Sequence, residues 1–172
     1  MFVKRLDHVN VLTPRFRETI EFYERVLDMR SGPGAIPYGA FVFDASGTAC
    51  IHVVEASTDS LDFLLTENLA HRSRAETDPA TGFATLSGGG AIDHVALICE
   101  GLLTTLERLR SLGEPHRYYF VERQRVHQIF LRDPNGIVLE LSFFEEVAPE
   151  ALERLNRGVL AVDRAPAVGP YA

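Results

Sequence analysis

A repeated motif divides this chain into two similar halves, and it constrains the fold more than any other feature of the sequence. Leu6-Asp7-His8-Val9 near the start returns as Ile92-Asp93-His94-Val95, and the two histidines are 86 residues apart. Both copies place a histidine inside a run of β-favouring residues. Because internal repetition indicates a duplicated structural unit, we expect two modules of the same design.

The first half predicts a strand, a helix and then further strands. The strand covers 6–12, and Thr13-Pro14 is a typical helix start, with a capping residue before a proline. The helix is expected to bury an apolar stripe made of Phe16, Ile20, Tyr23 and Leu27. A loop rich in Gly and Pro at 32–39 leads to a hairpin with strands at 40–44 and 50–55.

The second half repeats this order. A strand at 92–97 precedes a helix at 102–112, which Gly113 ends. Three more strands are predicted at 117–122, 126–132 and 137–143. The chain is therefore expected to be an α+β protein in which each half contributes one helix and one set of strands.

The predicted domain covers 1–145, with module one at about 4–56 and module two at about 91–145. Between them, 57–90 is rich in Thr, Ala, Ser and Gly and is interpreted as an insert or a lid over the site. Residues 146–172 are expected to form a short helix from Pro149 and a loosely held tail.

A carboxylate stands in the middle of the last predicted strand. Asp133-Pro134-Asn135-Gly136 is a turn signal in which Asn and Gly can adopt the positive φ of a tight hairpin. In the strand that follows, Val138, Glu140 and Ser142 share one face and Leu139 and Leu141 the other, which belongs to the core. Because an unpaired carboxylate is costly in an apolar strand, Glu140 needs a partner, and we infer a metal ion.

The repeat supplies further metal-competent side chains at matching positions. His8 and His94 lie on the first strand of each half, while His52 and Glu140 lie 88 residues apart on the last strands. Two imidazoles and a carboxylate on rigid strands suit a divalent transition metal with open coordination positions. His52 is a possible fourth ligand, an uncoordinated acid–base or a hydrogen-bonded residue of the cavity wall. The other histidines are expected to be ordinary core or surface residues: His71, His116 and His127.

Composition restricts the partners of the protein. The net charge of −7 argues against nucleic acid or an anionic membrane as the main partner, and no apolar run is long enough to span a bilayer. Two cysteines and an N-terminus without signal-peptide order suit a reducing compartment, so a cytoplasmic protein is expected.

Together these motifs resemble the vicinal oxygen chelate superfamily, which includes glyoxalase I, extradiol dioxygenases, and fosfomycin and bleomycin resistance proteins. The resemblance covers residues 6–143 except the insert, and rests on the repeated Asp-His-Val, the Phe-Tyr-Glu-Arg-Val-Leu-Asp-Met segment and Phe-Leu-Arg-Asp-Pro-Asn-Gly-Ile-Val-Leu-Glu-Leu. It implies tandem βαβββ modules that form a cup-shaped mixed sheet around a divalent metal. His8, His94 and Glu140 match the ligands of the superfamily.

Departures from the glyoxalase I pattern favour another reaction. His52 stands where glyoxalase I has a metal-bound glutamate base, and Leu12 replaces an arginine that anchors glutathione. The set with an additional histidine resembles the Fe(II) extradiol dioxygenases, and Gln128-Ile129-Phe130 resembles a segment of hydroxyphenylpyruvate dioxygenase, although Phe130 replaces the tyrosine of extradiol enzymes.

Three interpretations of function remain open. The favoured one is a ring-cleaving or related Fe(II) dioxygenase. The alternatives are a glyoxalase-I-like lyase or isomerase that uses Zn, Ni, Co or Mn, and a small-molecule binding or antibiotic-resistance protein. The resemblance also implies a homodimer. The two modules would then pair either within one chain or between the two chains of the dimer.

The remaining site predictions follow from strand phase. His52 and Gln128 are the predicted catalytic residues, since imidazole can move a proton and Gln128 faces the cavity. The predicted substrate contacts are polar or aromatic residues expected on the same faces: Asn10, Ser142, Phe130, and Tyr118 or Tyr119. The aromatic residues are equally consistent with ordinary core packing.

Overall fold

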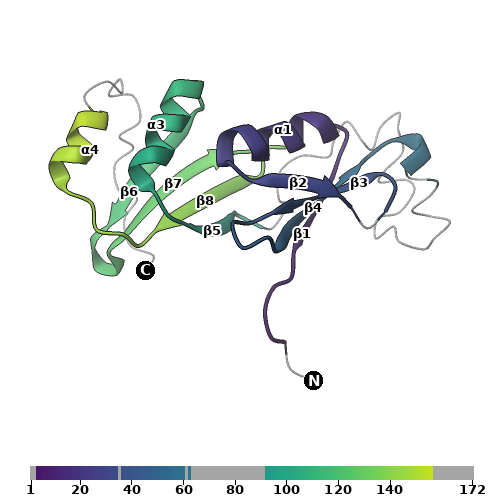
Figure 1. Cartoon of the computed structure of the whole chain (residues 1–172), viewed down its shortest axis with the longest axis horizontal. Helices are drawn as coiled ribbons and strands as arrows, with labels where there is room; N and C mark the ends of the chain where they lie inside the picture. The colour runs from purple at the N-terminus through teal and green to yellow at the C-terminus, as the bar shows by residue number, and fades with distance from the viewer. Residues whose placement is uncertain (1–2, 35, 61, 63–91, 157–172) are drawn as a thin grey trace. The chain divides into compact units, whose positions relative to one another are not determined.

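A computed structural model describes residues 3–34, 36–60, 62 and 92–156, and the chain divides into two compact units (Figure 1). The first unit contains residues 1–94 and 132–138, and the second contains 95–131 and 139–172. Most of the predicted insert at 57–90 lies outside the described residues, as do His71 and the tail from residue 157 onward.

The first unit is a four-stranded mixed sheet with one helix. Its elements are β1 (Val9–Thr13), α1 (Phe16–Leu27), β2 (Arg30–Pro33), β3 (Gly39–Phe43) and β4 (Ala49–Glu55). The strand order is β1-β4-β3-β2. Strand β1 is parallel to β4, while β4, β3 and β2 are antiparallel neighbours. The predicted hairpin is therefore confirmed as β3 and β4.

The second unit repeats this design. Its elements are β5 (Val95–Cys99), α3 (Leu102–Leu112), β6 (His116–Val121), β7 (Val126–Arg132) and β8 (Val138–Phe143). The order is β5-β8-β7-β6, with β5 parallel to β8. A short 3₁₀ turn and a helix complete it: η3 (Glu122–Gln124) and α4 (Pro149–Asn156). The predicted α+β fold with two βαβββ modules in tandem is confirmed.

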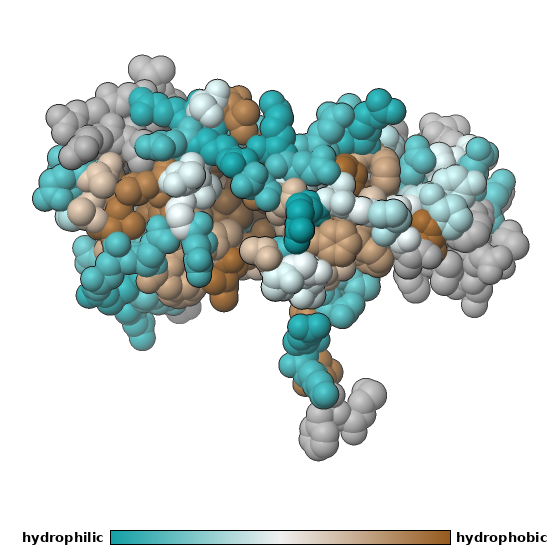
Figure 2. All heavy atoms as spheres, viewed as in Figure 1, coloured by the Kyte–Doolittle hydropathy of each residue, from teal (hydrophilic) through white to brown (hydrophobic). Residues whose placement is uncertain are grey.

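Helix α1 buries a different stripe from the predicted one. The buried residues are Thr19, Phe22, Tyr23 and Val26, whereas Phe16, Ile20 and Leu27 are half-exposed. Of the predicted stripe, only Tyr23 is buried. The observed spacing is again that of one helix face, and the opposite side of α1 is hydrophilic (Figure 2). The helix packs against β2, β3 and β4, where Val42 and Val53 are fully buried.

The starts of the elements also differ from the prediction. Helix α1 begins at Phe16, and Thr13 ends β1 instead of capping the helix. The Thr13 hydroxyl nevertheless accepts a hydrogen bond from the Arg15 backbone N–H at 2.8 Å. Strands β1 and β5 begin one residue after His8 and His94, so both histidines stand at the entrance of their strands.

Strand β2 occupies part of the segment predicted to be a loop. Arg30–Pro33 pairs with β3 in an antiparallel register, from Arg30 opposite Phe43 to Pro33 opposite Ala40. Gly32 and Pro33 made this segment look irregular. Because β2 is the edge strand of its sheet, a proline without a backbone N–H is tolerated there.

The turn between β7 and β8 is held by its own aspartate. Of the two residues predicted to have a positive φ, only Gly136 does, at 79°. The Gly136 N–H donates to the Asp133 carbonyl at 2.9 Å, and the Asp133 carboxylate accepts from the N–H groups of Asn135 and Ile137. Asp133 thus fixes the turn, and a positive φ at Asn135 is unnecessary.

A distant glutamate caps helix α3, and its loss is expected to destabilise the second unit. Glu145 accepts hydrogen bonds from the backbone N–H groups of Gly101 and Leu102, at 2.8 and 2.6 Å. Because these groups have no partner within the helix, Glu145→Ala is expected to lower the free energy of unfolding by about 1–2 kcal/mol. Chemical denaturation measures the change. Glu146→Ala is the control, since its ion pair with Arg125 is exposed and should contribute little. Equal losses in both variants would contradict the capping role.

Candidate metal and substrate site

One face of the first sheet gathers polar and aromatic side chains. Asn10 on β1 and Phe41 on β3 are both directly opposite His52 on β4. The imidazole of His8, just before β1, has its ring centroid 5.9 Å from that of His52 and 6.2 Å from that of Phe41. Because side chains alternate along strands, this face is opposite to the one that carries Val42 and Val53. Asn10 and His52 therefore share this face.

His8 and His94 have the same local partner. In each case the preceding aspartate lies against the ring, with Nδ1 2.7 Å from the Asp7 Oδ2 and 2.8 Å from the Asp93 Oδ2. An Nδ1–H that donates to a carboxylate leaves the proton off Nε2 in the neutral ring. Nε2 is then the nitrogen suited to bind a cation, the arrangement common for metal-binding histidines.

His52 is buried, with 7% of its surface exposed. The Asn10 amide nitrogen lies 3.1 Å from its Nδ1, so Nδ1 accepts and the neutral ring carries its proton on Nε2. Nε2 is buried and has no hydrogen-bond partner among the described residues. A Cβ at Gly39 would lie 2.7 Å from this atom, so glycine there makes room for the ring. Burial, and then the charge of His8, lowers the pKa of His52 from its ordinary value of 6.5.

Glu140 is the centre of the polar face of the second sheet. It is 8% exposed, and its Oε1 accepts hydrogen bonds from Gln128 Nε2 and Ser142 Oγ, both at 2.6 Å. The prediction that Gln128, Glu140 and Ser142 share a face is confirmed. The predicted core residues Leu139 and Leu141 lie on the other face and are 1% and 2% exposed.

The two tyrosines of β6 point to opposite faces. Tyr119 is opposite Gln128 and packs edge-to-face on Phe130, with ring centroids 5.8 Å apart. Tyr118 instead bonds through its hydroxyl to His127 Nδ1 at 2.7 Å. Of the two tyrosines, only Tyr119 lies on the face of Glu140. His127 is in the opposite phase to Gln128, as predicted.

His127 makes the stability of the second unit sensitive to pH. Burial lowers its pKa below 6.5, and the Glu145 carboxylate offsets only part of this effect. The unfolded chain therefore binds a proton more readily, and stability should fall as pH drops below about 6.5, by at most about 1.4 kcal/mol per pH unit for one proton. In urea titrations between pH 7.5 and 5, His127→Gln should show a shallower loss than wild type. An unchanged pH slope would contradict this assignment.

The predicted ligands are divided between the units. His8 and His94 belong to the first, and Glu140 belongs to the second. Among the described residues, no group of three or more His, Cys, Asp or Glu side chains is gathered to hold a metal ion. The donor chemistry itself fits a divalent transition metal, because it combines imidazole nitrogens with a buried carboxylate.

Sequence reasoning did not assign Asp7 and Asp93 a function. Both are strongly exposed, at 78% and 95% of their side chains, which is typical of ordinary surface residues. The available signal was their position in the repeat, since each precedes a histidine in the same motif. Exposure alone therefore did not reveal that these aspartates contact the imidazoles of His8 and His94.

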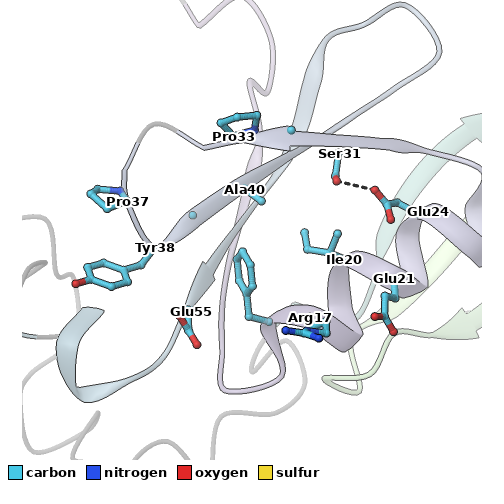
Figure 3. A pocket seen from close by; sticks show the side chains of 13 residues that line it. Arg17, Ile20, Glu21, Glu24, Ser31, Pro33, Pro37, Tyr38, Ala40 and Glu55 are labelled. Carbon is cyan, nitrogen blue, oxygen red and sulfur yellow. Dashed lines mark hydrogen bonds between the residues drawn. The ribbon is translucent and has the colours of Figure 1, made fainter.

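A concavity lies in the first unit between α1 and strands β2 to β4 (Figure 3). Its volume is about 670 Å³, and Phe16, Ile20 and Tyr38 line it together with Glu21 and Glu24. Ser31 donates to Glu24 at 2.6 Å at its edge. None of the predicted site residues lines this concavity. It is therefore distinct from the face of the sheet that carries His8 and His52.

Among the part of the chain that the structure describes, no helix is long and apolar enough to cross a membrane.

Comparison with solved structures identifies the fold. A protein from the mobile metagenome of V. pseudocholerae has a TM-score of 0.57 and 20% identity, covering 85% of this chain and 98% of its own. Lactoylglutathione lyase from Agrobacterium tumefaciens has a TM-score of 0.55 and 13% identity, covering 82% and 94%. The fosfomycin resistance protein FosX from Listeria monocytogenes has a TM-score of 0.52 and 14% identity, covering 87% and 98%.

Comparison of sequences identifies the family. No curated protein matches the chain. The family model described as the Glyoxalase/Bleomycin resistance protein/Dioxygenase superfamily matches residues 5–141, which include both copies of the repeat and the turn before β8. With two βαβββ units of the corresponding fold, this chain belongs to the Glyoxalase/Bleomycin resistance protein/Dioxygenase superfamily, the vicinal oxygen chelate group.

Proposed function

We propose that this chain is a divalent-metal enzyme in which His8, His94 and Glu140 hold the ion. The observation that carries the proposal is that every one of these donors has a polar partner of the kind that orients metal ligands. Asp7 and Asp93 contact the Nδ1 atoms of the two histidines, and Gln128 and Ser142 donate to the carboxylate of Glu140. Such partners fix the donor atom and strengthen its binding to a cation.

The substrate in this proposal is a small molecule with two adjacent oxygens. When bound, the ion would supply Lewis-acid stabilisation of the negative charge that develops on those oxygens. His52 is the proposed proton carrier. The amide of Asn10 supports this role because it holds Nδ1 of His52 and so sets which nitrogen carries the proton. With Nδ1 of His52 occupied by the amide of Asn10, Nε2 is the ring nitrogen that would exchange a proton in this role.

Within this class we propose an Fe(II)-dependent dioxygenase acting on a catechol-like ring. A histidine at position 52 replaces the carboxylate base of glyoxalase I, and Leu12 replaces its glutathione-anchoring arginine. Aromatic side chains also lie beside the polar groups of both sheets, Phe41 against His52 and Phe130 against Tyr119. Flat apolar walls of this type suit an aromatic substrate.

Two measurements test the reaction class. Metal analysis of protein purified without added metal should find iron, and the Fe(II)-loaded protein should consume oxygen when catechols are added. Turnover of α-hydroxycarbonyl or thiohemiacetal substrates with Zn, Ni, Co or Mn, and without oxygen, would instead establish a glyoxalase-like lyase or isomerase. Retention of a ligand without turnover under any metal would establish a binding or resistance protein.

We also propose that the protein forms a homodimer. Strands β1 and β5 are edge strands of their sheets, and Ile98 on β5, which is directly opposite Ser142 and therefore on the same face of the sheet, is 83% exposed. An exposed apolar residue on an open edge favours association with another chain. Light scattering of the purified protein tests this, and Ile98→Lys should shift a dimer toward the monomer. A monomer at all concentrations would contradict it.

A further inference from the structure

The two hydrogen bonds to Glu140 converge on one oxygen. Gln128 reaches Oε1 from the neighbouring strand β7, and Ser142 reaches the same atom from two residues further along β8. Both donor–acceptor distances are 2.6 Å, which is short for the N–H···O bond of Gln128 and typical of a hydroxyl, such as that of Ser142, that donates to a carboxylate. Because two donors on different strands share this atom, they restrict the position of Oε1 and with it the orientation of the carboxylate.

This geometry concerns two residues for which the sequence predicted other roles. The sequence predicted that Gln128 is catalytic and that Ser142 contacts substrate. In the structure, the amide nitrogen of Gln128 and the hydroxyl of Ser142 are both engaged with Glu140. Ser142 is also buried, at 7% exposure, which limits its access to a substrate.

We propose that Gln128 and Ser142 are positioning residues that orient the Glu140 carboxylate and thereby set the affinity of the metal site. This inference rests on the proposed function, because it treats Glu140 as a ligand. The competing explanation is purely structural, since a buried carboxylate needs donors whether or not it binds an ion. A structural role affects only stability, whereas a positioning role changes metal affinity and coordination in the folded protein.

The test compares metal binding by variants that preserve side-chain volume. Gln128→Met keeps the length of the side chain but removes the donor, and Ser142→Ala removes the hydroxyl. Titration with Co²⁺ gives both an affinity and an absorption spectrum that reports coordination geometry, and competition with a chelating dye gives the affinity for Zn²⁺. Each variant is expected to bind about 10–100-fold more weakly than wild type, with an altered Co²⁺ spectrum.

Matched controls separate positioning from general damage. Gln124→Met and Ser111→Ala make the same chemical changes at exposed positions of the same unit and should bind like wild type. Ser142→Thr keeps a hydroxyl and should recover most of the affinity lost in Ser142→Ala. Thermal melting confirms that every variant is folded at the temperature of the titration.

The outcomes distinguish failure of the positioning role from failure of the proposed metal-binding function. If wild type binds neither Co²⁺ nor Zn²⁺, the proposed metal site and this inference both fail. If wild type binds and Glu140→Ala does not, but Gln128→Met and Ser142→Ala retain wild-type affinity and spectrum, only this inference is overturned. In that case the two donors serve the stability of the strand pair alone.

Discussion

Replacing His8 with alanine is expected to abolish tight metal binding and all metal-dependent turnover. His8 supplies one of three proposed protein donors, and the loss of a direct ligand should exceed the roughly 100-fold upper range seen for outer partners. The side chain is 36% exposed, so little packing is lost with it. Calorimetric titration with Zn²⁺ and Co²⁺ measures the affinity, and circular dichroism monitors the fold. His94→Ala and Glu140→Ala are expected to behave in the same way.

His116→Ala is the matched control for this prediction. His116 is also a half-exposed histidine at the start of a strand, but its Nδ1 lies 2.8 Å from the Glu114 carbonyl oxygen, and it is opposite Leu131 on the face away from Gln128. It should bind metal like wild type. If His8→Ala retained wild-type affinity, His8 would not be a ligand, whatever the other variants showed. Asp7→Ala should fall between the two, because it removes only the partner of the ring.

The duplicated design could be predicted because its signals are local and occur twice. The spacing of apolar residues and the position of Gly113 predicted α3 with correct ends, and alternation in Val126–Arg132 and Val138–Phe143 predicted which side chains share a face. The face of Glu140 followed from strand phase alone, since phase needs no knowledge of tertiary contacts.

Features that depend on distant contacts could not be read in this way. The buried stripe of α1 includes Thr19, a polar residue that a search for apolar spacing does not select. Its hydroxyl is satisfied by the Arg15 carbonyl and by the side-chain amide of Asn135, more than a hundred residues away. In the same way, β2 is a strand because it pairs with β3, although its own sequence contains Gly32 and Pro33.

The same long-range contacts lead to the largest expected effect on stability. Asn135, in the turn before β8, is 7% exposed and bonds to three buried side chains of the first unit. Its amide nitrogen donates to Thr19 and to Asp133, and its amide oxygen accepts from the Thr13 hydroxyl. Asn135→Ala removes all of these bonds and leaves the Thr13 hydroxyl without this acceptor. We expect the free energy of unfolding to fall by about 2–4 kcal/mol, since each unsatisfied buried polar group costs about 1–3 kcal/mol.

Arg132→Ala is the control for this prediction. Arg132 donates to the Gly136 carbonyl of the same turn at 2.8 Å, but it does so from an exposed position. A substitution there should change stability by no more than about 0.5 kcal/mol, because water replaces the lost bond. Urea denaturation of both variants therefore separates the effect of losing buried hydrogen bonds from the effect of any substitution near the turn. If the two losses were equal, the buried hydrogen bonds of Asn135 with Thr13 and Thr19 would not be what holds the turn in place. If only Asn135→Ala is destabilised, the Asp133-Pro134-Asn135-Gly136 motif, which was predicted only to form a hairpin turn, also stabilises the tertiary structure through its contacts with Thr13 and Thr19.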